Sequence, residues 1–461
     1  MKMPQADYRS FPDLALRAGA EGRYISDDAH RLDLAVLLSR RFLDAPLATM
    51  NGRSVFIACE KQLPAVLAAI ALDSIAQRIV LGLPDIAPAH LPAIVALANV
   101  DVVVSDNKPK HLIPGVASVT CHVDPRSAGS DEHVRAQGTE WILLTSGTTG
   151  EPKLVAHSLA SLVGPLDDML IARDAVWSTF YDVRRYGGLQ ILLRALVGGG
   201  SMVLSSSSEG VGDFLERAGR SGITHFSGTP SHWRKALMSG KASSISPRYV
   251  RLSGEIADQA ILDLLRATYP KAEIAHAFAS TEAGVVFDVR DGLAGFPASY
   301  FERPRFNVEM RVVEGSLRVR SLRTAKGYLG GKSALRDGNG FVDTGDLLER
   351  AGDRYYFIGR REGVINVGGQ KVFPEEVEAV INRHPAVQVS RVVGRQSPIT
   401  GALVAAEVVP RQPEPKAEAS LRDSILHHCR NELHPHKVPV SLRFVPELEI
   451  AASGKLKRHN A

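Results

Sequence analysis

The chain has 461 residues, of which 44% are hydrophobic and 23% charged, and its formal net charge is +5. A globular chain of this length is too long for one hydrophobic core, so two or more folding units are expected. The basic residues form no dense stripe with interleaved aromatic residues, which argues against nucleic-acid binding. The three cysteines are scattered along the chain, which argues against a disulfide scaffold or a zinc site. Because the first ten residues lack an apolar signal region and no apolar run is long enough to span a bilayer, we expect a cytoplasmic protein without membrane insertion.

The first third of the chain alternates short β-branched runs with helical periods. Residues 54–59, 78–81 and 100–104 are predicted strands, and residues 63–77 and 86–99 are predicted helices. Between residues 140 and 290 the pattern repeats, with strands at 141–144 and 201–204 and helices at 191–196 and 257–268. Strands that alternate with helices indicate α/β sheets with crossover connections.

The pattern changes in the last third. Residues 308–357 alternate with a period near two, which favours a small antiparallel β-subdomain. Helices are then predicted at 374–383 and 420–433, and strands at 387–393 and 402–409. We therefore expect an α/β fold, with a large N-terminal domain of α/β sheets plus the β-subdomain at 1–358, a hinge at 359–363, and a small mobile α+β C-terminal lid domain at 364–461.

The most informative stretch directly follows the apolar run 141–144. It consists of Thr145, Ser146, Gly147, Thr148, Thr149, Gly150 and Lys153 together with Glu151 and Pro152. Glycines let backbone N–H groups approach an anion, and hydroxyls and a lysine add further donors. These features predict a phosphate-binding loop, although the same residue types also form ordinary surface turns. A Walker A motif is excluded, because the position five before Gly331 in the candidate Gly331-Lys332-Ser333 is Lys326 rather than glycine.

The loop resembles the signature loop of the adenylate-forming superfamily, which contains acyl-CoA synthetases, peptide-synthetase adenylation domains and luciferases. Four further segments resemble that family's motifs in the family's order: FASTE at 278–282, DTGDL at 343–347, the segment 359–378, and ASGKL at 452–456. Within these, residues 369–378 are most similar to fatty-acyl- and aryl-CoA ligases. Five matches between residues 143 and 456 cover most of the chain.

The resemblance implies an ATP-dependent carboxylic acid–thiol ligase. Such an enzyme forms an acyl-adenylate and pyrophosphate and then a thioester and AMP, and it uses ATP, Mg²⁺ and coenzyme A. One alternative is an enzyme that loads a small-molecule carboxylic acid onto the phosphopantetheine of a separate acyl carrier protein. A second is a nucleotide-binding paralogue without ligase activity. The region before the phosphate loop is shorter than is usual for the family, which leaves a homodimer with an altered contact open.

Residue roles follow from the same resemblance. The loop from Thr145 to Lys153 would bind the β- and γ-phosphates, Thr281 the α-phosphate, and Glu282 the metal. Further assignments are Phe278 stacked on adenine, Gly254, Glu255 and Ile256 as the opposite wall, Asp346 at the ribose, Arg360 at the ribose or phosphates, Glu362 as hinge, and Lys455 bridging the carboxylate and α-phosphate. Gly368 and Gly369 would line a thiol tunnel, although they also fit a β-hairpin turn.

The acid pocket is the least determined part of the site. Arg184 stands where the family's ligases often have His, followed by Tyr186 and Gly187. An arginine there either reads a second carboxylate or polar ring substituent, or faces solvent or a structural carboxylate. Further candidates for the lining are His225, Ser253 and His276.

Overall fold

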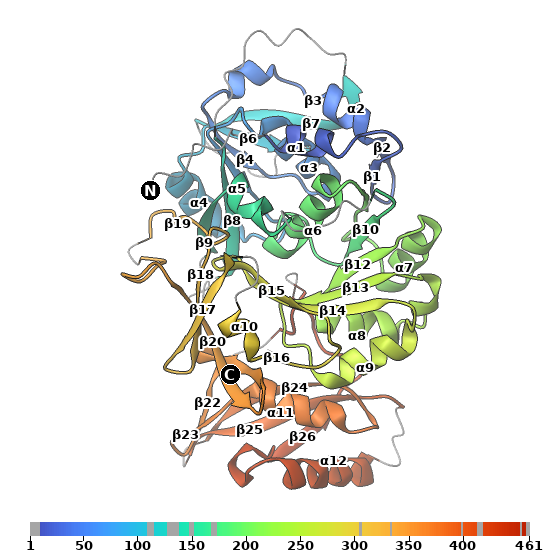
Figure 1. Ribbon diagram of the computed structural model, residues 1–461, viewed down its shortest axis with the longest axis vertical. Coiled ribbons are helices and arrows are strands. Elements are labelled where there is room, and N and C mark those ends of the chain that lie inside the picture. Colours follow the sequence, from blue (N-terminus) through green and yellow to red (C-terminus); the bar gives the residue numbers. More distant parts are fainter. Residues whose placement is uncertain are drawn as a thin grey trace.

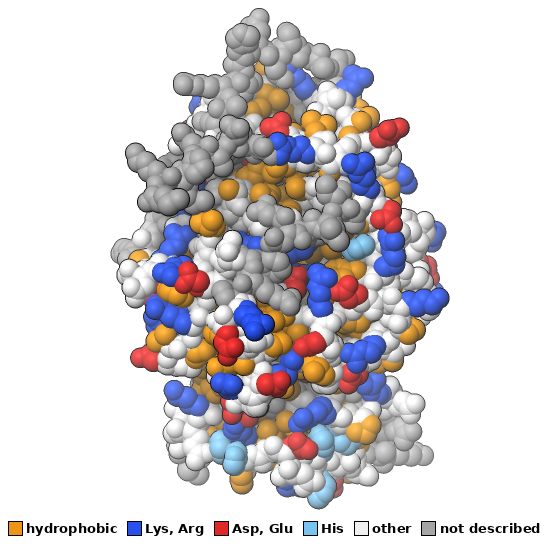
Figure 2. Space-filling view, viewed as in Figure 1, with side chains coloured by type: hydrophobic (Ala, Val, Ile, Leu, Met, Phe, Trp, Pro, Cys, Tyr) orange, Lys and Arg blue, Asp and Glu red, His pale blue; other side chains and the backbone are white. Residues whose placement is uncertain are grey.

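A computed structural model of the protein describes residues 10–107, 115–126, 138–146, 152–166, 173–303, 307–331, 334–397, 400–412, 418–451 and 454–457. Its strands form four sheets, and in Figure 1 the first lies at the top, the second and third lie side by side in the middle, and the fourth lies at the bottom. Positive and negative side chains are interspersed over the face shown in Figure 2, as the mild net charge suggests. No helix in the described ranges is both long and apolar enough to cross a membrane.

The first sheet lies at the N-terminal end of the molecule and has the order β19-β9-β8-β5-β4-β6-β7-β3. Its strands are β3 (Arg41–Leu43), β4 (Ser54–Ile57), β5 (Arg78–Leu81), β6 (Val102–Ser105), β7 (Ala117–Arg126), β8 (Glu140–Ser146), β9 (Pro152–Ser158) and β19 (Gly327–Tyr328). The neighbouring helices are α1 (Phe11–Arg17), α2 (Leu34–Ser39), α3 (Gln62–Leu72), α4 (Leu91–Ala98) and α5 (Leu159–Val163). Strands β8, β5, β4 and β6 pair in parallel, as the alternating pattern predicts.

The second sheet has the order β15-β14-β13-β12-β10-β11-β1-β2. Its strands are β1 (Tyr24–Ser26), β2 (Arg31–Asp33), β10 (Val176–Thr179), β11 (Ser201–Val203), β12 (His225–Gly228), β13 (Tyr249–Ser253), β14 (Glu273–Ser280) and β15 (Gly284–Val289). The helices are α6 (Tyr186–Val197), α7 (Val211–Arg220), α8 (Pro230–Met238) and α9 (Gln259–Thr268). Strands β10, β12, β13 and β14 pair in parallel, so their carboxyl ends share one edge, where α/β sheets usually bind ligands.

The third sheet is the small β-subdomain, with the order β16-β21-β20-β18-β17 and only antiparallel pairings. It consists of β16 (Phe296–Pro297), β17 (Glu309–Val313), β18 (Ser316–Arg320), β20 (Val342–Ala351) and β21 (Arg354–Arg360), with α10 (Ser299–Glu302) nearby. The antiparallel subdomain predicted for residues 308–357 is therefore present.

The fourth sheet forms the C-terminal unit at the other end of the molecule. It contains β22 (Ile365–Val367), β23 (Gln370–Val372), β24 (Val387–Ser397), β25 (Gly401–Pro410) and β26 (Ser441–Phe444), with α11 (Pro374–Arg383) and α12 (Glu418–Glu432). These elements enclose a separate apolar core that includes Val377, Ile381, Val392, Val408 and Ile425. The α/β class with a small α+β C-terminal domain is confirmed.

Two predicted helices are shorter in the structure. The helix predicted at 63–77 ends at Leu72, because Asp73 is buried as an anchor that accepts hydrogen bonds from the Phe11 amide and the Trp141 indole. The helix predicted at 86–99 begins at Leu91 and ends at Ala98, and the C-cap residue Asn99 terminates it with a left-handed φ of 49°.

Candidate active site

A cavity of about 1260 Å³ lies where the carboxyl edge of the second sheet meets the β-subdomain and the C-terminal unit. It brings together most residues predicted from the sequence. Those in its lining are Thr145, Lys153, Tyr186, Gly187, Ser253, Gly254, Glu255, Ile256, His276, Phe278, Thr281, Glu282, Asp346, Arg360, Glu362 and Lys455. A cavity of this size can hold a nucleotide together with a small acid.

The predicted phosphate loop connects the antiparallel strands β8 and β9. Thr145 pairs with Lys153 across this hairpin, and Ser146 closes β8 opposite Pro152. Gly147, Thr148, Thr149 and Gly150 lie outside the described residues. The Lys153 ammonium is 5.7 Å from the centroid of the Tyr328 ring, so it stands at the cavity beside the hairpin.

Thr281 and Glu282 are held at the turn between β14 and β15. His157 Nε2 donates a hydrogen bond of 2.7 Å to the Thr281 carbonyl. Burial lowers the pKa of His157 to about 4, so its ring is neutral near pH 7 with the proton on Nε2. The Tyr328 hydroxyl donates to Glu282 Oε1 across 3.3 Å. The backbone at this turn is thus fixed, while the Glu282 carboxylate faces the cavity.

The Glu282 carboxylate is a suitable ligand for Mg²⁺. Among the described residues no group of three or more His, Cys, Asp or Glu side chains forms a metal site. Mg²⁺ in nucleotide enzymes is commonly held by one or two carboxylates together with phosphate oxygens and water. A single carboxylate at the cavity wall fits that coordination.

Asp346 and Arg360 face each other across the β20–β21 ladder, and Arg360 Nε lies 3.4 Å from Asp346 Oδ1. Burial raises the pKa of Asp346 despite this cation. Lys455 reaches the same cavity from the C-terminal unit, and a methyl group built on Gly254 would lie 3.8 Å from its Cε. Burial away from water is the main cause that lowers the pKa of Lys455, and repulsion from Arg360 is the second. The carboxylates of Glu255, Asp346 and Glu282 oppose this shift.

Phe278 borders the cavity as half of an aromatic pair. Its ring stacks on Phe357 of β21 with centroids 4.6 Å apart and an interplanar angle of 21°. This pair is a flat apolar platform at the cavity wall, which suits a purine ring. The role of Phe278 at adenine stays a prediction.

Gly254, Glu255 and Ile256 line the cavity as predicted, but the Glu255 side chain has specific partners. Its carboxylate accepts hydrogen bonds from the Ser231 amide and hydroxyl and from the Leu456 amide. The side chain therefore joins the large domain to the loop that carries Lys455.

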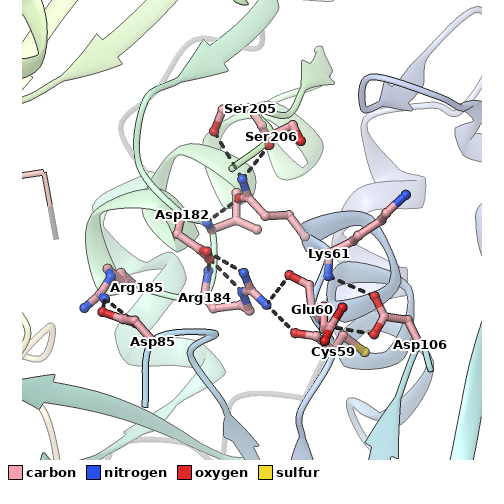
Figure 3. A network of polar contacts seen from close by, with 12 residues as sticks. Cys59, Glu60, Lys61, Asp85, Asp106, Asp182, Arg184, Arg185, Ser205 and Ser206 are labelled. Atoms are coloured by element: carbon pink, nitrogen blue, oxygen red, sulfur yellow. Dashed lines mark hydrogen bonds and ion pairs between the residues drawn. The ribbon is translucent and has the colours of Figure 1, made fainter. Parts of the chain in front are cut away.

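The prediction that Arg184 lines the acid pocket is wrong. Its guanidinium is 3% exposed and forms an ion pair with Asp182, and it also donates to the carbonyls of Cys59 and Glu60. Figure 3 shows Arg184 enclosed by these groups, with Arg185 directed away from it toward Asp85. The alternative that Arg184 faces a structural carboxylate therefore holds, with Asp182 as that carboxylate. Of the two neighbouring arginines, Arg185 is the one that lines the cavity.

The prediction that His225 lines the acid pocket is also wrong. It begins β12, at the opposite end of the strand from the cavity edge. Its ring packs 4.6 Å from the Trp177 ring centroid, and its Nδ1 is 2.8 Å from the Thr224 hydroxyl. Tyr186, Gly187, Ser253 and His276 remain as acid-pocket candidates in the lining.

Gly368 and Gly369 form the tip of the β22–β23 hairpin with φ values of 57° and 84°. They are absent from the cavity lining among the described residues, so this structure shows the hairpin turn and leaves the tunnel role a prediction. Glu362 lies in the single 3₁₀ turn Arg361–Gly363 between β21 and β22.

Several site residues were not found from the sequence. Tyr181 donates its hydroxyl to the Ser253 carbonyl at 2.7 Å, and Tyr328 reaches Glu282 from a short strand far along the chain. No local pattern marks either tyrosine. Thr229, Ser231 and Arg234 were detectable in principle, because Thr229-Pro230 after an apolar strand is a helix N-cap signal at the carboxyl edge.

Comparisons with known proteins agree with this geometry. A family model described as AMP-binding enzyme matches residues 41–329, and one described as AMP-binding enzyme C-terminal domain matches residues 376–455. The chain is 29% identical over 345 residues to a 2-succinylbenzoate–CoA ligase of Bacillus cereus, covering 69% of this chain and 68% of that protein. A ligase of the same name from Bacillus anthracis is 29% identical over 357 residues, with the same coverage.

Solved structures share the fold over nearly the whole chain. An anthranilate CoA ligase in complex with anthranoyl-AMP superposes with a TM-score of 0.82 at 19% identity, covering 97% of this chain and 96% of that one. An o-succinylbenzoate CoA synthetase from Bacillus subtilis in complex with its acyl-adenylate gives a TM-score of 0.75 at 21% identity, covering 97% of both chains.

Proposed function

The chain belongs to the AMP-binding enzyme family and is an AMP-forming acid–thiol ligase, and we propose that it activates an aromatic carboxylic acid for transfer to coenzyme A. The observation that carries this proposal is that Lys455, Glu282 and Asp346, from three separate parts of the chain, meet in one cavity. Tyr181, Tyr186 and Phe278 give that cavity an aromatic lining. The names of the relatives, 2-succinylbenzoate and anthranilate ligases, also favour an aryl acid.

In the first half-reaction a carboxylate oxygen of the acid bonds to the α-phosphorus of ATP. The bond between that phosphorus and the bridging oxygen breaks, and its electron pair leaves with pyrophosphate. Both reactants are anions, so the site must supply positive charge and alignment. Lys455 supplies this charge, since its ammonium enters the cavity near Gly254, and Thr281 contacts the α-phosphate.

Other residues bind the rest of the nucleotide. Glu282 would hold Mg²⁺, which when bound would neutralise phosphate charge. Lys153 with the β8–β9 loop binds the terminal phosphates, and Asp346 accepts hydrogen bonds from the ribose hydroxyls. Arg360 orients Asp346 across the strand ladder, and the Phe278–Phe357 pair supports the adenine.

In the second half-reaction the thiol sulfur attacks the carbonyl carbon, and AMP leaves with the electron pair of the anhydride bond. In the present arrangement Lys455 occupies the cavity and the Gly368-Gly369 hairpin lies outside its lining. The C-terminal unit therefore turns about the segment around Glu362, so that the hairpin replaces Lys455 beside the acyl-adenylate. The proposed units are residues 1–358, the hinge 359–363, and the lid 364–461.

The test compares acids and acceptors in the purified protein with Mg²⁺-ATP. Benzoate, anthranilate and 2-succinylbenzoate are compared with octanoate and malonate, following pyrophosphate release and, by mass spectrometry, the thioester. We expect aryl acids to be preferred and coenzyme A to be acylated. Preference for octanoate or malonate would contradict the acid class, and exclusive acylation of a pantetheinylated carrier protein would favour the carrier-loading alternative. No acid-dependent pyrophosphate release with any acid would favour a paralogue without ligase activity.

A further inference from the structure

The loop that carries Lys455 is attached to the large domain on both sides of the lysine. After it, the Leu456 amide donates to Glu255 Oε1 across 2.9 Å. Before it, the Gly454 carbonyl accepts a hydrogen bond of 2.5 Å from the Thr229 hydroxyl. Because both neighbours of Lys455 are fixed, the direction in which its side chain leaves the backbone is fixed as well.

Glu255 is itself held in place by α8. The Ser231 amide donates to Glu255 Oε2 at 2.9 Å, and the Ser231 hydroxyl donates to Oε1 at 3.0 Å. Both carboxylate oxygens therefore accept hydrogen bonds, and Oε1 joins Ser231 of the large domain to Leu456 of the C-terminal unit. Hydrogen bonds to an ionised acceptor are among the strong ones in proteins, particularly away from bulk water.

The same helix also contacts the lid beyond the lysine loop. Arg234 forms an ion pair with Asp258 and donates to the Gln388 carbonyl, and the Asn382 amide donates to Asp258. The first turns of α8 and the residues after β13 thus form one docking surface for this lid position. Thr229 and Glu255 are its contacts on the two sides of the lysine, and Glu255 is the charged one.

We propose that Glu255 is a positioning residue that anchors the Lys455 loop in the adenylate-forming lid position and acts on adenylation alone. The proposal rests on the proposed function, because it requires that the lid leaves this position before the thiol reacts. Contacts that exist only in the first lid position accelerate the first half-reaction and contribute nothing to the second. This role differs from that of a wall residue of the adenine slot, which would affect nucleotide binding in both half-reactions.

The test uses Glu255→Ala, with Glu255→Gln as the conservative variant and Glu273→Ala as the matched control. Glu273 is an exposed carboxylate at the start of β14 that pairs with Arg290 and lies outside the cavity lining. For Glu255→Ala we expect acid-dependent pyrophosphate release to fall at least tenfold in kcat. The KM for ATP, the Kd for AMP and thioester formation from supplied aryl-AMP and coenzyme A should stay within about twofold of wild type. Glu255→Gln should be intermediate because one oxygen remains as acceptor, and Glu273→Ala should match wild type.

Hydrogen exchange at the Leu456 amide tests the anchor without any substrate. Exchange in full-length Glu255→Ala should be faster than in wild type, whereas Glu273→Ala should leave it unchanged. Weaker AMP binding with equal loss of both half-reactions would overturn the proposal in favour of an adenine-wall role, and unchanged exchange at Leu456 would also overturn it. If exchange rises as expected but wild-type protein releases no pyrophosphate with any acid, the anchor stands and the proposed function fails.

Discussion

The proposed role of the Lys455 side chain distinguishes the two half-reactions. Its ammonium shares the cavity with the carboxylates of Glu282 and Asp346, and the proposed function requires the C-terminal unit that carries it to move before the thiol reacts. Lys455→Ala should therefore lower acid-dependent pyrophosphate release by about 100-fold or more, a loss typical for a preorganised charged donor. Thioester formation from supplied acyl-AMP should keep its rate. Measuring the two half-reactions separately checks this, and an equal loss in both would remove Lys455 from its role.

Arg184 and Arg185 are adjacent in sequence but have different physical roles. Arg184 is buried, forms an ion pair with Asp182 and donates to two backbone carbonyls. Arg185 forms an ion pair with the exposed Asp85. Arg184→Leu should destabilise the protein by about 3–5 kcal/mol, because it leaves buried acceptors and a carboxylate without their cation. Arg185→Leu should cost at most about 1 kcal/mol, as for exposed pairs.

Thermal or urea denaturation of these two variants measures the difference, and an acid panel accompanies it. Arg184→Leu should lower activity with every acid in proportion to the loss of folded protein. A selective loss with acids that carry a second carboxylate would restore Arg184 to the acid pocket.

At the scale of elements, the lysine loop packs on α8 through a glycine. Gly454 has φ of +80°, and a Cβ added there would lie 2.0 Å from Cε1 of His232. Gly454→Ala should therefore prevent this lid position and reduce adenylation at least tenfold, while thioester formation from acyl-AMP is preserved. Adding His232→Ala removes the obstructing ring and should restore part of the adenylation rate, with His232→Ala alone as the control. A double variant no better than Gly454→Ala would show that the ring is not the obstacle.

Sequence patterns identified elements well where local physics decides them. Residues 78–81 and 374–383 have in the structure the bounds that were predicted, because an apolar run and a proline at the first helical turn define them locally. The predicted end of a helix was wrong where tertiary contacts determine it, as at Asp73, whose carboxylate accepts hydrogen bonds from Phe11 and Trp141. Most of the predicted motif residues that the structure describes line one cavity, and Gly368 and Gly369 do not. The direction in which a side chain leaves a loop depends on distant partners. Arg184 turns toward carbonyls at residues 59 and 60, which no pattern near residue 184 encodes.

At the scale of the whole molecule, buried neutral histidines make stability depend on pH. Burial lowers the pKa of His157 and His225 to about 4 and that of His232 to about 3, while in the unfolded chain each should titrate near 6.5. Below about pH 6.5 the unfolded state binds more protons, so stability should fall as the pH drops toward 4. Each histidine contributes up to about 1.4 kcal/mol per pH unit.

Urea midpoints at pH 7.5, 6 and 5 measure this dependence. Most carboxylates contribute less in this window, since their ordinary pKa values lie below about 4.5. Asp346 is an exception, because burial raises its pKa. His225→Gln should reduce the slope of the unfolding free energy against pH, because unfolding of this variant takes up as much as one proton fewer than unfolding of wild type. A midpoint that does not change between pH 7.5 and 5 would contradict the burial of these rings.

In the proposed first half-reaction, the carboxylate of the acid attacks the α-phosphorus of ATP in the cavity shared by Glu282, Asp346 and Lys455. An aryl acid labelled with oxygen-18 at both carboxylate oxygens tests this attack, with Mg²⁺-ATP and coenzyme A present and AMP analysed by mass spectrometry. We expect each AMP formed to carry one oxygen-18 atom from the acid and pyrophosphate to carry none. Label in inorganic phosphate with formation of ADP, or thioester formed with unlabelled AMP, would contradict it.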